Sequence, residues 1–179
     1  MGDGDNNYFF NSVIAHTAGG ANQRLAALNM AWCPQSSVAQ GNNFFDNGHP
    51  VSIGISTDFD NSSIFHNPDN PTQTNVCNGI FVDVVNAHDQ ALLMTWSATE
   101  VAYVFGGFAG NSWAMDAGKK LVLGDNVVIK FAKYTTPGFS ILMSDGTTQL
   151  QNYNVTGVAF TAYSDDSFKE DTNSDGPSS

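Results

Sequence analysis

Short runs of alternating apolar and polar residues follow one another from residue 50 onward. The clearest is VSIGIS at 51–56, in which Val51, Ile53 and Ile55 alternate with small polar residues. A period of two is typical of a β-strand with one buried face and one face in water. Further runs with this pattern occupy 79–85, 91–96, 99–105 and 156–163. The segments 79–85, 91–96 and 99–105 predict a meander of three strands, and 156–163 predicts a last strand.

Two turn signals join strand-like segments later in the chain. Gly124-Asp125-Asn126 divides KKLVL from VVIKF, and Asp145-Gly146 divides FSILMS from TTQLQNY. Asp-Gly between alternating segments is a strong hairpin signal. We therefore expect an all-β fold, an antiparallel β-sandwich or jelly-roll-like domain of roughly 8–10 strands. No internal repeat is apparent in the sequence.

The most apolar segment, residues 91–115, carries a single formal charge, at Glu100. A transmembrane helix needs about 20 consecutive apolar residues and would hold this carboxylate near its middle. Glycines at 106, 107 and 110 then interrupt the segment. Two strands separated by a polar turn explain it better.

Two segments differ from the rest of the chain. Residues 20–32 fit one face of a helix and also a strand, so both assignments stay open. Residues 164–179 are acidic and nearly devoid of apolar side chains, which predicts a disordered tail behind a single β domain at 1–163.

The charge balance limits the partners. Six basic residues oppose 17 acidic ones, and the formal net charge is -11. Such a surface repels nucleic acid and anionic membranes, because both are recognised through Lys and Arg. We expect a neutral glycan or a zwitterionic lipid surface as partner.

Cys33 and Cys77 are the two cysteines, so the chain has either one disulfide or two free thiols. No signal peptide or membrane-spanning segment is apparent. This fits cytoplasmic synthesis with release as well as a mature secreted form, and the compartment stays open.

Sequence motifs for catalysis are absent. The chain has no nucleophile elbow, phosphate-binding loop or His-Glu-x-x-His sequence. Its four histidines, His16, His49, His66 and His88, lack a second ligand at metal-binding spacing. Asp83 is the one carboxyl that apolar strand residues flank. We expect a protein that is not an enzyme.

A long polar segment between two predicted strands, residues 57–78, is the first candidate binding surface. Connections of this length are usually functional or disordered. Its planar amides, carboxylate and imidazole offer directional hydrogen bonds to sugar hydroxyls, beside the rings of Phe59 and Phe65. The candidate ligand-binding residues here are Asn61, His66, Asn67, Asp69 and Asn70. The alternative is a mobile surface loop.

A second candidate surface is the segment FGGFAGNSWAMD at 105–116. Its aromatic residues are separated by small ones, as in a loop that presents rings to a ligand or to a membrane interface. The candidate residues are Phe108, Asn111, Trp113 and Asp116. Packing of these rings in the core is the alternative. Trp32 and Trp96 are expected in the core.

Calcium is the only cofactor that the sequence raises. Asp58, Asp60 and Ser62 place three oxygen ligands at alternate positions, and hard oxygen ligands suit this ion. Residues 171–176, DTNSDG, match the first half of a calcium loop, but the glutamate that completes such a loop is missing. No cofactor is expected otherwise.

The overall character of the chain, acidic, rich in Asn, Gly and Thr and built from paired strands, is similar to that of many lectins and small β-sandwich cytolysins. The leading hypothesis is a non-enzymatic, lectin-like protein that recognises neutral glycans. The alternatives are a membrane-active, pore-forming toxin and a structural capsid or appendage subunit, and a homo-oligomer is compatible with each.

Overall fold

The structure is a computed structural model that describes residues 7–18, 26–31, 37–83, 93–105, 112–132, 140–143, 146–154 and 156–176. These residues form strands and turns, and none of them is in a helix. Accordingly, no helix in this part of the chain could cross a membrane. The prediction of an all-β protein is confirmed.

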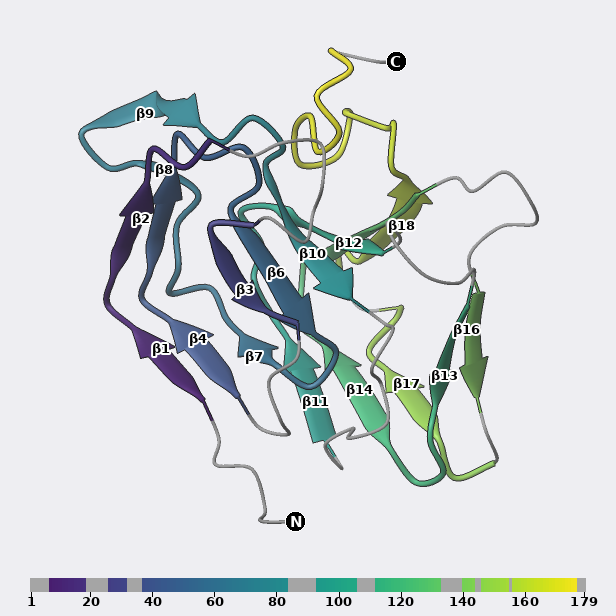
Figure 1. The fold of residues 1–179 in the computed structure, drawn as a ribbon. Coiled ribbons are helices and arrows are strands. Elements are labelled where there is room, and N and C mark those ends of the chain that lie inside the picture. Colours follow the sequence, from purple (N-terminus) through teal and green to yellow (C-terminus); the bar gives the residue numbers. More distant parts are fainter. Residues whose placement is uncertain are drawn as a thin grey trace.

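Two six-stranded sheets make up most of the molecule (Figure 1). Sheet I consists of β1 (Tyr8–Phe10), β4 (Val38–Gln40), β7 (Asp58–Phe59), β11 (Leu93–Trp96), β14 (Lys120–Leu123) and β17 (Gln149–Gln151), in that order. Sheet II consists of β3 (Leu28–Met30), β6 (Val51–Gly54), β10 (Gly79–Asp83), β12 (Ala102–Phe105), β15 (Val128–Phe131) and β18 (Ala159–Ala162). The chain alternates between the two sheets, so successive strands rarely pair with each other.

Three two-stranded sheets complete the fold. β2 (Val13–Ala15) pairs with β5 (Asn43–Phe45), and β13 (Ser112–Met115) pairs with β16 (Ser140–Met143). Both of these pairs are parallel. β8 (His66–Asn67) and β9 (Asn70–Thr74) form the one antiparallel pair among the described strands, a hairpin that projects beside β2 in Figure 1.

The chain is therefore a β-solenoid of six coils, each of which contributes one strand to sheet I and one to sheet II. The coils comprise residues 8–30, 38–54, 58–83, 93–105, 112–131 and 140–162, numbered here coil 1 to coil 6. The prediction of an antiparallel sandwich or jelly roll was wrong. Alternation of apolar and polar residues shows that a strand has two different faces, but it does not show the direction of the neighbouring strand.

The first predicted hairpin is a corner of the solenoid, and at the second, where Asp145 lies outside the described residues, the flanking strands do not pair with each other. β14 and β15 flank Gly124-Asp125-Asn126 but belong to different sheets, as do β16 and β17 on either side of the second signal. Asn126 has a φ of 61°, a left-handed conformation that Asn and Gly adopt most readily. On the next coil Gly157 lies against it at a φ of 75°, where a Cβ would come within 2.1 Å of Asn126 Oδ1. A turn signal of this kind shows that the chain changes direction, but it does not show which strands pair with each other.

Apolar side chains point into the solenoid and align across the coils. In sheet II one inward column runs through all six coils, because each residue pairs in register with the next: Leu28, Val51, Ile80, Tyr103, Ile129 and Phe160. In sheet I, Phe59 pairs with Trp96, and both are fully buried. Trp96 stacks on Tyr103 with ring centroids 4.8 Å apart, which confirms its predicted place in the core.

Buried asparagines connect coils 1 to 3 at one corner. Asn47 Oδ1 accepts hydrogen bonds from the backbone N–H and the hydroxyl of Thr17, at 3.2 and 2.9 Å. Asn47 Nδ2 donates to the carbonyl of Ile14 and to Oδ1 of Asn75, both at 2.9 Å. Asn75 Nδ2 then donates to the carbonyl of Phe44 at 3.0 Å. This asparagine ladder satisfies corner groups that the strands leave without partners.

A second ladder connects the same coils at the preceding corner. The backbone N–H of Ser12 donates to Asn42 Oδ1 at 3.1 Å, and Asn42 Nδ2 donates to the carbonyl of Phe9 at 3.0 Å. The N–H of Asn42 donates to the hydroxyl of Ser63 at 3.2 Å. Asn42 is fully buried, and the hydrogen bonds of its side-chain amide hold neighbouring coils together.

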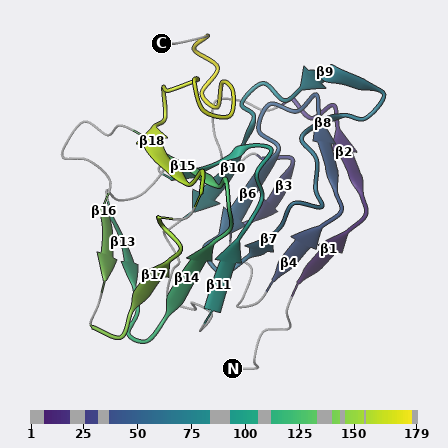
Figure 2. The same cartoon turned by 180° about the vertical axis from the view of Figure 1, so that it is seen from behind.

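The outer face of sheet II is covered by the C-terminal segment, residues 163–176, instead of water. Phe81 and Val104 pair in register on this face and are buried together with Cys77 and Tyr163. The hydroxyl of Tyr163 donates to the carbonyl of Thr172 at 3.0 Å. Figure 2 shows the segment, in yellow, above β10, β15 and β18. Residues 164–176, for which the sequence predicts disorder, thus pack on the solenoid in the structure.

The structure also changes the expectation for residues 51–56. Val51 and Ile53 point inward as predicted, but Ser52, on the supposed wet face, is only 4 % exposed. Residues 28–30, in the segment left open between helix and strand, form β3. Cys77 is a buried free thiol, while Cys33 and Trp32 lie outside the described residues.

Lys130 anchors the C-terminal segment from the outer face of β15. Its side chain is completely buried, and Nζ donates to the carbonyl of Glu170 at 2.8 Å and to Thr172 Oγ1 at 3.3 Å. Asp166 lies 3.9 Å from Nζ. Burial lowers the pKa of the ammonium group, and the negative charge of Asp166 opposes that shift.

We expect Asn47→Ala to lower the free energy of unfolding by about 3 kcal/mol, because it leaves several buried corner groups without partners. Urea denaturation measures the change. Asn70→Ala is the matched control, since Asn70 is exposed on the β8–β9 hairpin, and its effect should stay within about 0.5 kcal/mol. Equal losses for the two variants would contradict a structural role of the ladder.

We also expect wild-type stability to rise relative to that of Lys130→Met as the pH rises from neutral toward the ordinary pKa of lysine, 10.5. Lys130 loses its proton at a lower pH when folded than when unfolded, where its pKa is near 10.5, so deprotonation favours the folded state. The measurement is the difference between the urea midpoints of the two proteins across this range. Cys77 and Tyr103 titrate in both and cancel. Parallel stability curves would contradict the buried ammonium group.

Candidate functional site

The outer face of sheet I carries both exposed aromatic rings and polar groups. Residues that pair in register point to the same side of a sheet. Phe9, Ala39 and Phe59 pair in turn and point inward. The residues on either side of them therefore point outward, which places Tyr8 and Phe10 on the outer face.

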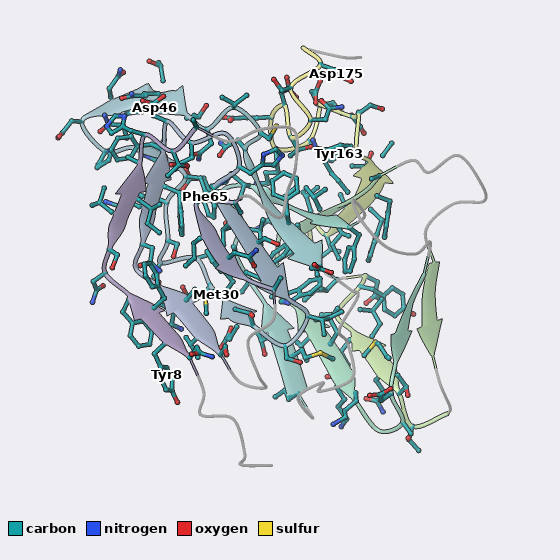
Figure 3. The ribbon with its side chains drawn as sticks, in the orientation of Figure 1. Tyr8, Met30, Asp46, Phe65, Tyr163 and Asp175 are labelled. Atoms are coloured by element: carbon teal, nitrogen blue, oxygen red, sulfur yellow. The ribbon has the colours of Figure 1, made fainter. Side chains whose placement is uncertain are left out.

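Tyr8 and Phe10 form an exposed aromatic pair on β1. The two residues are 61 % and 45 % exposed, and their rings stack with centroids 5.9 Å apart and an interplanar angle of 30°. Figure 3 shows Tyr8 projecting from the edge of the sheet. Tyr8 pairs with Val38, and Phe10 pairs with Gln40, so a planar amide lies beside the rings. Together they make an apolar platform with a polar border.

Two carboxylates continue this face at β7. Val38 pairs with Asp58, which places the Asp58 carboxyl two strands from Tyr8. Burial raises the pKa of Asp58, and the negative charge of Asp60 raises it further. Asp60 Oδ1 accepts from the backbone N–H and the hydroxyl of Ser62, at 2.9 and 2.5 Å. The side chains can thus accept and donate hydrogen bonds along the sheet.

Two of the predicted calcium ligands, Asp60 and Ser62, already form hydrogen bonds within the chain. The Ser62 hydroxyl donates to Asp60 and accepts from the N–H of Gly41 at 2.8 Å. Calcium binding by Asp58, Asp60 and Ser62 stays a prediction.

The structure brings another group of carboxylates together in the C-terminal segment. Ligand oxygens of Asp166, Asp171 and Asp175 lie within 4.8 Å of one another. Asp171 Oδ1 accepts from the N–H groups of Asn173 and Ser174, at 3.0 and 2.5 Å, which is the turn geometry expected of the DTNSDG sequence. Lys130 offsets part of the negative charge. Oxygen donors of this kind are those that calcium prefers.

The residues predicted from the 57–78 segment lie on and near the β8–β9 hairpin. His66 Nδ1 is 2.5 Å from Glu100 Oε1, and the hydroxyl of Thr99 donates to Asn61 Oδ1 at 2.9 Å. The turn before β12 thus holds the base of the hairpin. Sequence reasoning missed Thr99 and Glu100, because the contact joins positions 34 to 38 residues apart.

The remaining hairpin residues bond mostly to one another. Asn67 Nδ2 donates to Gln73 Oε1 at 2.7 Å, and Asn67 Oδ1 accepts from the N–H of Asp69 at 3.0 Å. The hydroxyl of Thr72 donates to Asn70 Oδ1 at 2.9 Å. Much of the hydrogen-bonding capacity predicted for a ligand is therefore used inside the hairpin.

The aromatic residues expected beside these amides do not face outward. Phe59 and Phe65 are both fully buried and pack against Phe44, with ring centroids 6.3 and 5.3 Å away. A sugar cannot stack on either ring. The exposed rings of the candidate site are instead those of Tyr8 and Phe10, in a segment that sequence reasoning passed over.

The second predicted surface is only partly described. Phe108 and Asn111 lie outside the described residues, and Trp113 is placed by its backbone, which pairs with Ile141 in β13 and β16. The carbonyl of Asp116 accepts a hydrogen bond from Thr148 at 3.0 Å. This residue is in coil 5, whereas the hairpin belongs to coil 3, so the described candidates do not form one site.

A shallow hollow of about 330 Å³ lies beside the asparagine ladder. It is lined by His16, Asp46, Asn47 and Val76, among others. His16 Nδ1 is 2.6 Å from Asp46 Oδ2, and both side chains are more than half exposed. In Figure 3, Asp46 lies far from Tyr8, on the side of the molecule from which the β8–β9 hairpin projects.

No protein family matches the chain, and neither a curated protein nor a solved structure resembles it significantly.

Proposed function

We propose that the chain is a non-enzymatic carbohydrate-binding protein that holds a neutral polysaccharide against the outer face of sheet I. The observation that carries the proposal is the stacked, exposed ring pair of Tyr8 and Phe10. Sugar rings present apolar C–H faces that pack on aromatic rings. The two rings are already stacked, and both residues are about half exposed or more. They offer such a platform without a rearrangement of the protein.

Polar groups beside the platform suit the sugar hydroxyls. Gln40 can donate and accept, while Asp58 and Asp60 accept when ionised. The raised pKa of Asp58 means that this carboxyl keeps its proton to a higher pH than an ordinary one, and can then also donate. Neighbouring strands repeat at about 4.8 Å. A ligand that runs along this direction can meet the outward side chains of successive coils, such as Phe10 and Gln40.

Charge favours a neutral ligand. The net charge of -11 and the carboxylates at β7 oppose an acidic polymer, whereas uncharged hydroxyls carry no such penalty. We propose binding of the glycan without catalysis, because hydrogen-bonding groups and a stacking platform are what this face supplies.

The toxin alternative depends on the 105–116 segment, of which residues 106–111 lie outside the described chain.

We expect Tyr8→Ala and Phe10→Ala each to weaken binding to a neutral polysaccharide about tenfold, and the double variant to weaken it further. Affinity electrophoresis and pull-down with cellulose, amylose and chitin measure the effect, with polygalacturonate as the acidic comparison. Phe168→Ala is the matched control, since Phe168 is 43 % exposed and lies in the C-terminal segment.

Retention of the wild-type protein on polygalacturonate alone would contradict the proposal. So would an absence of binding to every neutral polymer, or a loss on Phe168→Ala as large as that on Phe10→Ala.

A further inference from the structure

The outer face of sheet I is much longer across its strands than along them. Its strands have two to four residues, and four residues cover about 10 Å at the usual rise of a strand. Six strands at a spacing of about 4.8 Å cover about 24 Å. Figures 1 and 2 show the six strands side by side in this order. A ligand that contacts the whole face must therefore lie across the strands, from coil 1 to coil 6.

One row of outward side chains crosses all six strands. Its members, one from each coil, lie side by side from strand to strand: Tyr8, Val38, Asp58, Thr95, Val122 and Gln151. The step from Asp58 to Thr95 follows from the pairing of the next residue in each strand, Phe59 with Trp96. Tyr8 is exposed and the other five are partly exposed, while the residues that alternate with them in β11 and β14 are buried. We call this set the axial row.

The axial row offers both kinds of contact that a sugar chain needs. The ring of Tyr8 and the two valines of the row present apolar surface to the C–H faces of sugar rings. In the middle of the row, Asp58 accepts hydrogen bonds when ionised, and the Thr95 hydroxyl can donate and accept. At the end of the row, Gln151 Nε2 donates to Gln149 Oε1 at 2.5 Å, which orients the Gln151 amide. Apolar and polar groups thus recur along the length of the row.

We propose that the ligand of this face is a linear, β-linked neutral polysaccharide of the cellulose type, bound in its extended form along the axial row. This inference rests on the proposed glycan binding and names the class of glycan. Equatorial β-linkages make such a chain a straight ribbon, in which each sugar advances by a distance close to the spacing of neighbouring strands. An α-linked chain of the amylose type curls into a helix, so it can contact only a short part of the row.

The Tyr8–Phe10 platform lies at one end of the axial row, so short and long glycans differ in their contacts. A disaccharide on the platform reaches only the strands nearest β1, whereas a hexasaccharide in extended form reaches β14 and β17. Each added sugar gains contacts at a further strand, up to Gln151 in β17. Affinity should therefore rise with the length of the ligand, a property that the platform alone does not provide.

The test measures the affinity of the full chain for cello-oligosaccharides, from the disaccharide to the hexasaccharide, by isothermal titration calorimetry. Malto-oligosaccharides of the same lengths are the α-linked comparison. We expect the affinity for the β-linked series to rise with length, so that the hexasaccharide binds about tenfold more tightly than the disaccharide. The α-linked series should gain little beyond the disaccharide.

Gln151→Ala removes a hydrogen-bonding group at the end of the axial row farthest from the platform. It should weaken binding of cellohexaose about fivefold, the effect of about one hydrogen bond, and leave binding of the disaccharide unchanged. Gln73→Ala is the matched control, because Gln73 also bonds to a neighbouring amide, that of Asn67, but lies on the β8–β9 hairpin. It should bind both ligands as the wild type does.

The outcomes separate this inference from the proposed function. Binding that depends on Tyr8 but does not increase with the length of the β-linked ligand would overturn the inference and leave the proposed function standing. Equal gains for the α-linked series would do the same, as would equal effects of Gln151→Ala and Gln73→Ala. An absence of binding to both series and to the neutral polymers would contradict the proposed function itself, and the inference with it.

Discussion

Parallel, in-register pairing between successive coils is the constraint on which the rest of this structure depends. It places like residues above one another, so that Leu28 to Phe160 form one inward column and Ser52, Phe81 and Val104 one outward row. At the corners, where strands end, the Asn47 and Asn42 amides take over the hydrogen bonding between coils. The core and the outer faces both follow from this pairing.

The same pairing explains the different character of the outer surfaces. The outer face of sheet II is covered by the C-terminal segment, which encloses Lys130 and accepts its hydrogen bonds at the Glu170 carbonyl and at Thr172 Oγ1. The outer face of sheet I, as far as the described residues show, has no such cover and carries the Tyr8–Phe10 platform beside Gln40 and Asp58. The proposed glycan binding uses the outer face of sheet I.

The sequence predicts the strands of this fold much better than their partners. The alternation at 51–56 and the burial of Trp96 could be recognised, since each depends on local pattern and apolar character. Strand direction could not, because a corner and a hairpin use the same left-handed residues, as at Asn126. The coils are also hard to recognise in the sequence, because the spacing between paired residues varies. Val38 pairs with Asp58, 20 positions away, but Phe59 pairs with Trp96, 37 positions away. The hydrogen-bonding residues of the hairpin were recognisable by type, whereas their partner Glu100 and the exposure of Tyr8 depend on tertiary structure.

The most direct test of the solenoid is disulfide formation between engineered cysteines, in a chain with Cys33→Ser and Cys77→Ala. Val122 and Gln151 pair in register between β14 and β17, and strands about 4.8 Å apart lie within reach of a disulfide. The account predicts rapid oxidation of the Val122→Cys, Gln151→Cys protein. It predicts little for Val122→Cys with Leu150→Cys, because Leu150 points inward. A hairpin around Gly124–Asn126 would instead place Val122 beside Val128, so efficient oxidation of Val122→Cys with Val128→Cys, and none between positions 122 and 151, would contradict the account.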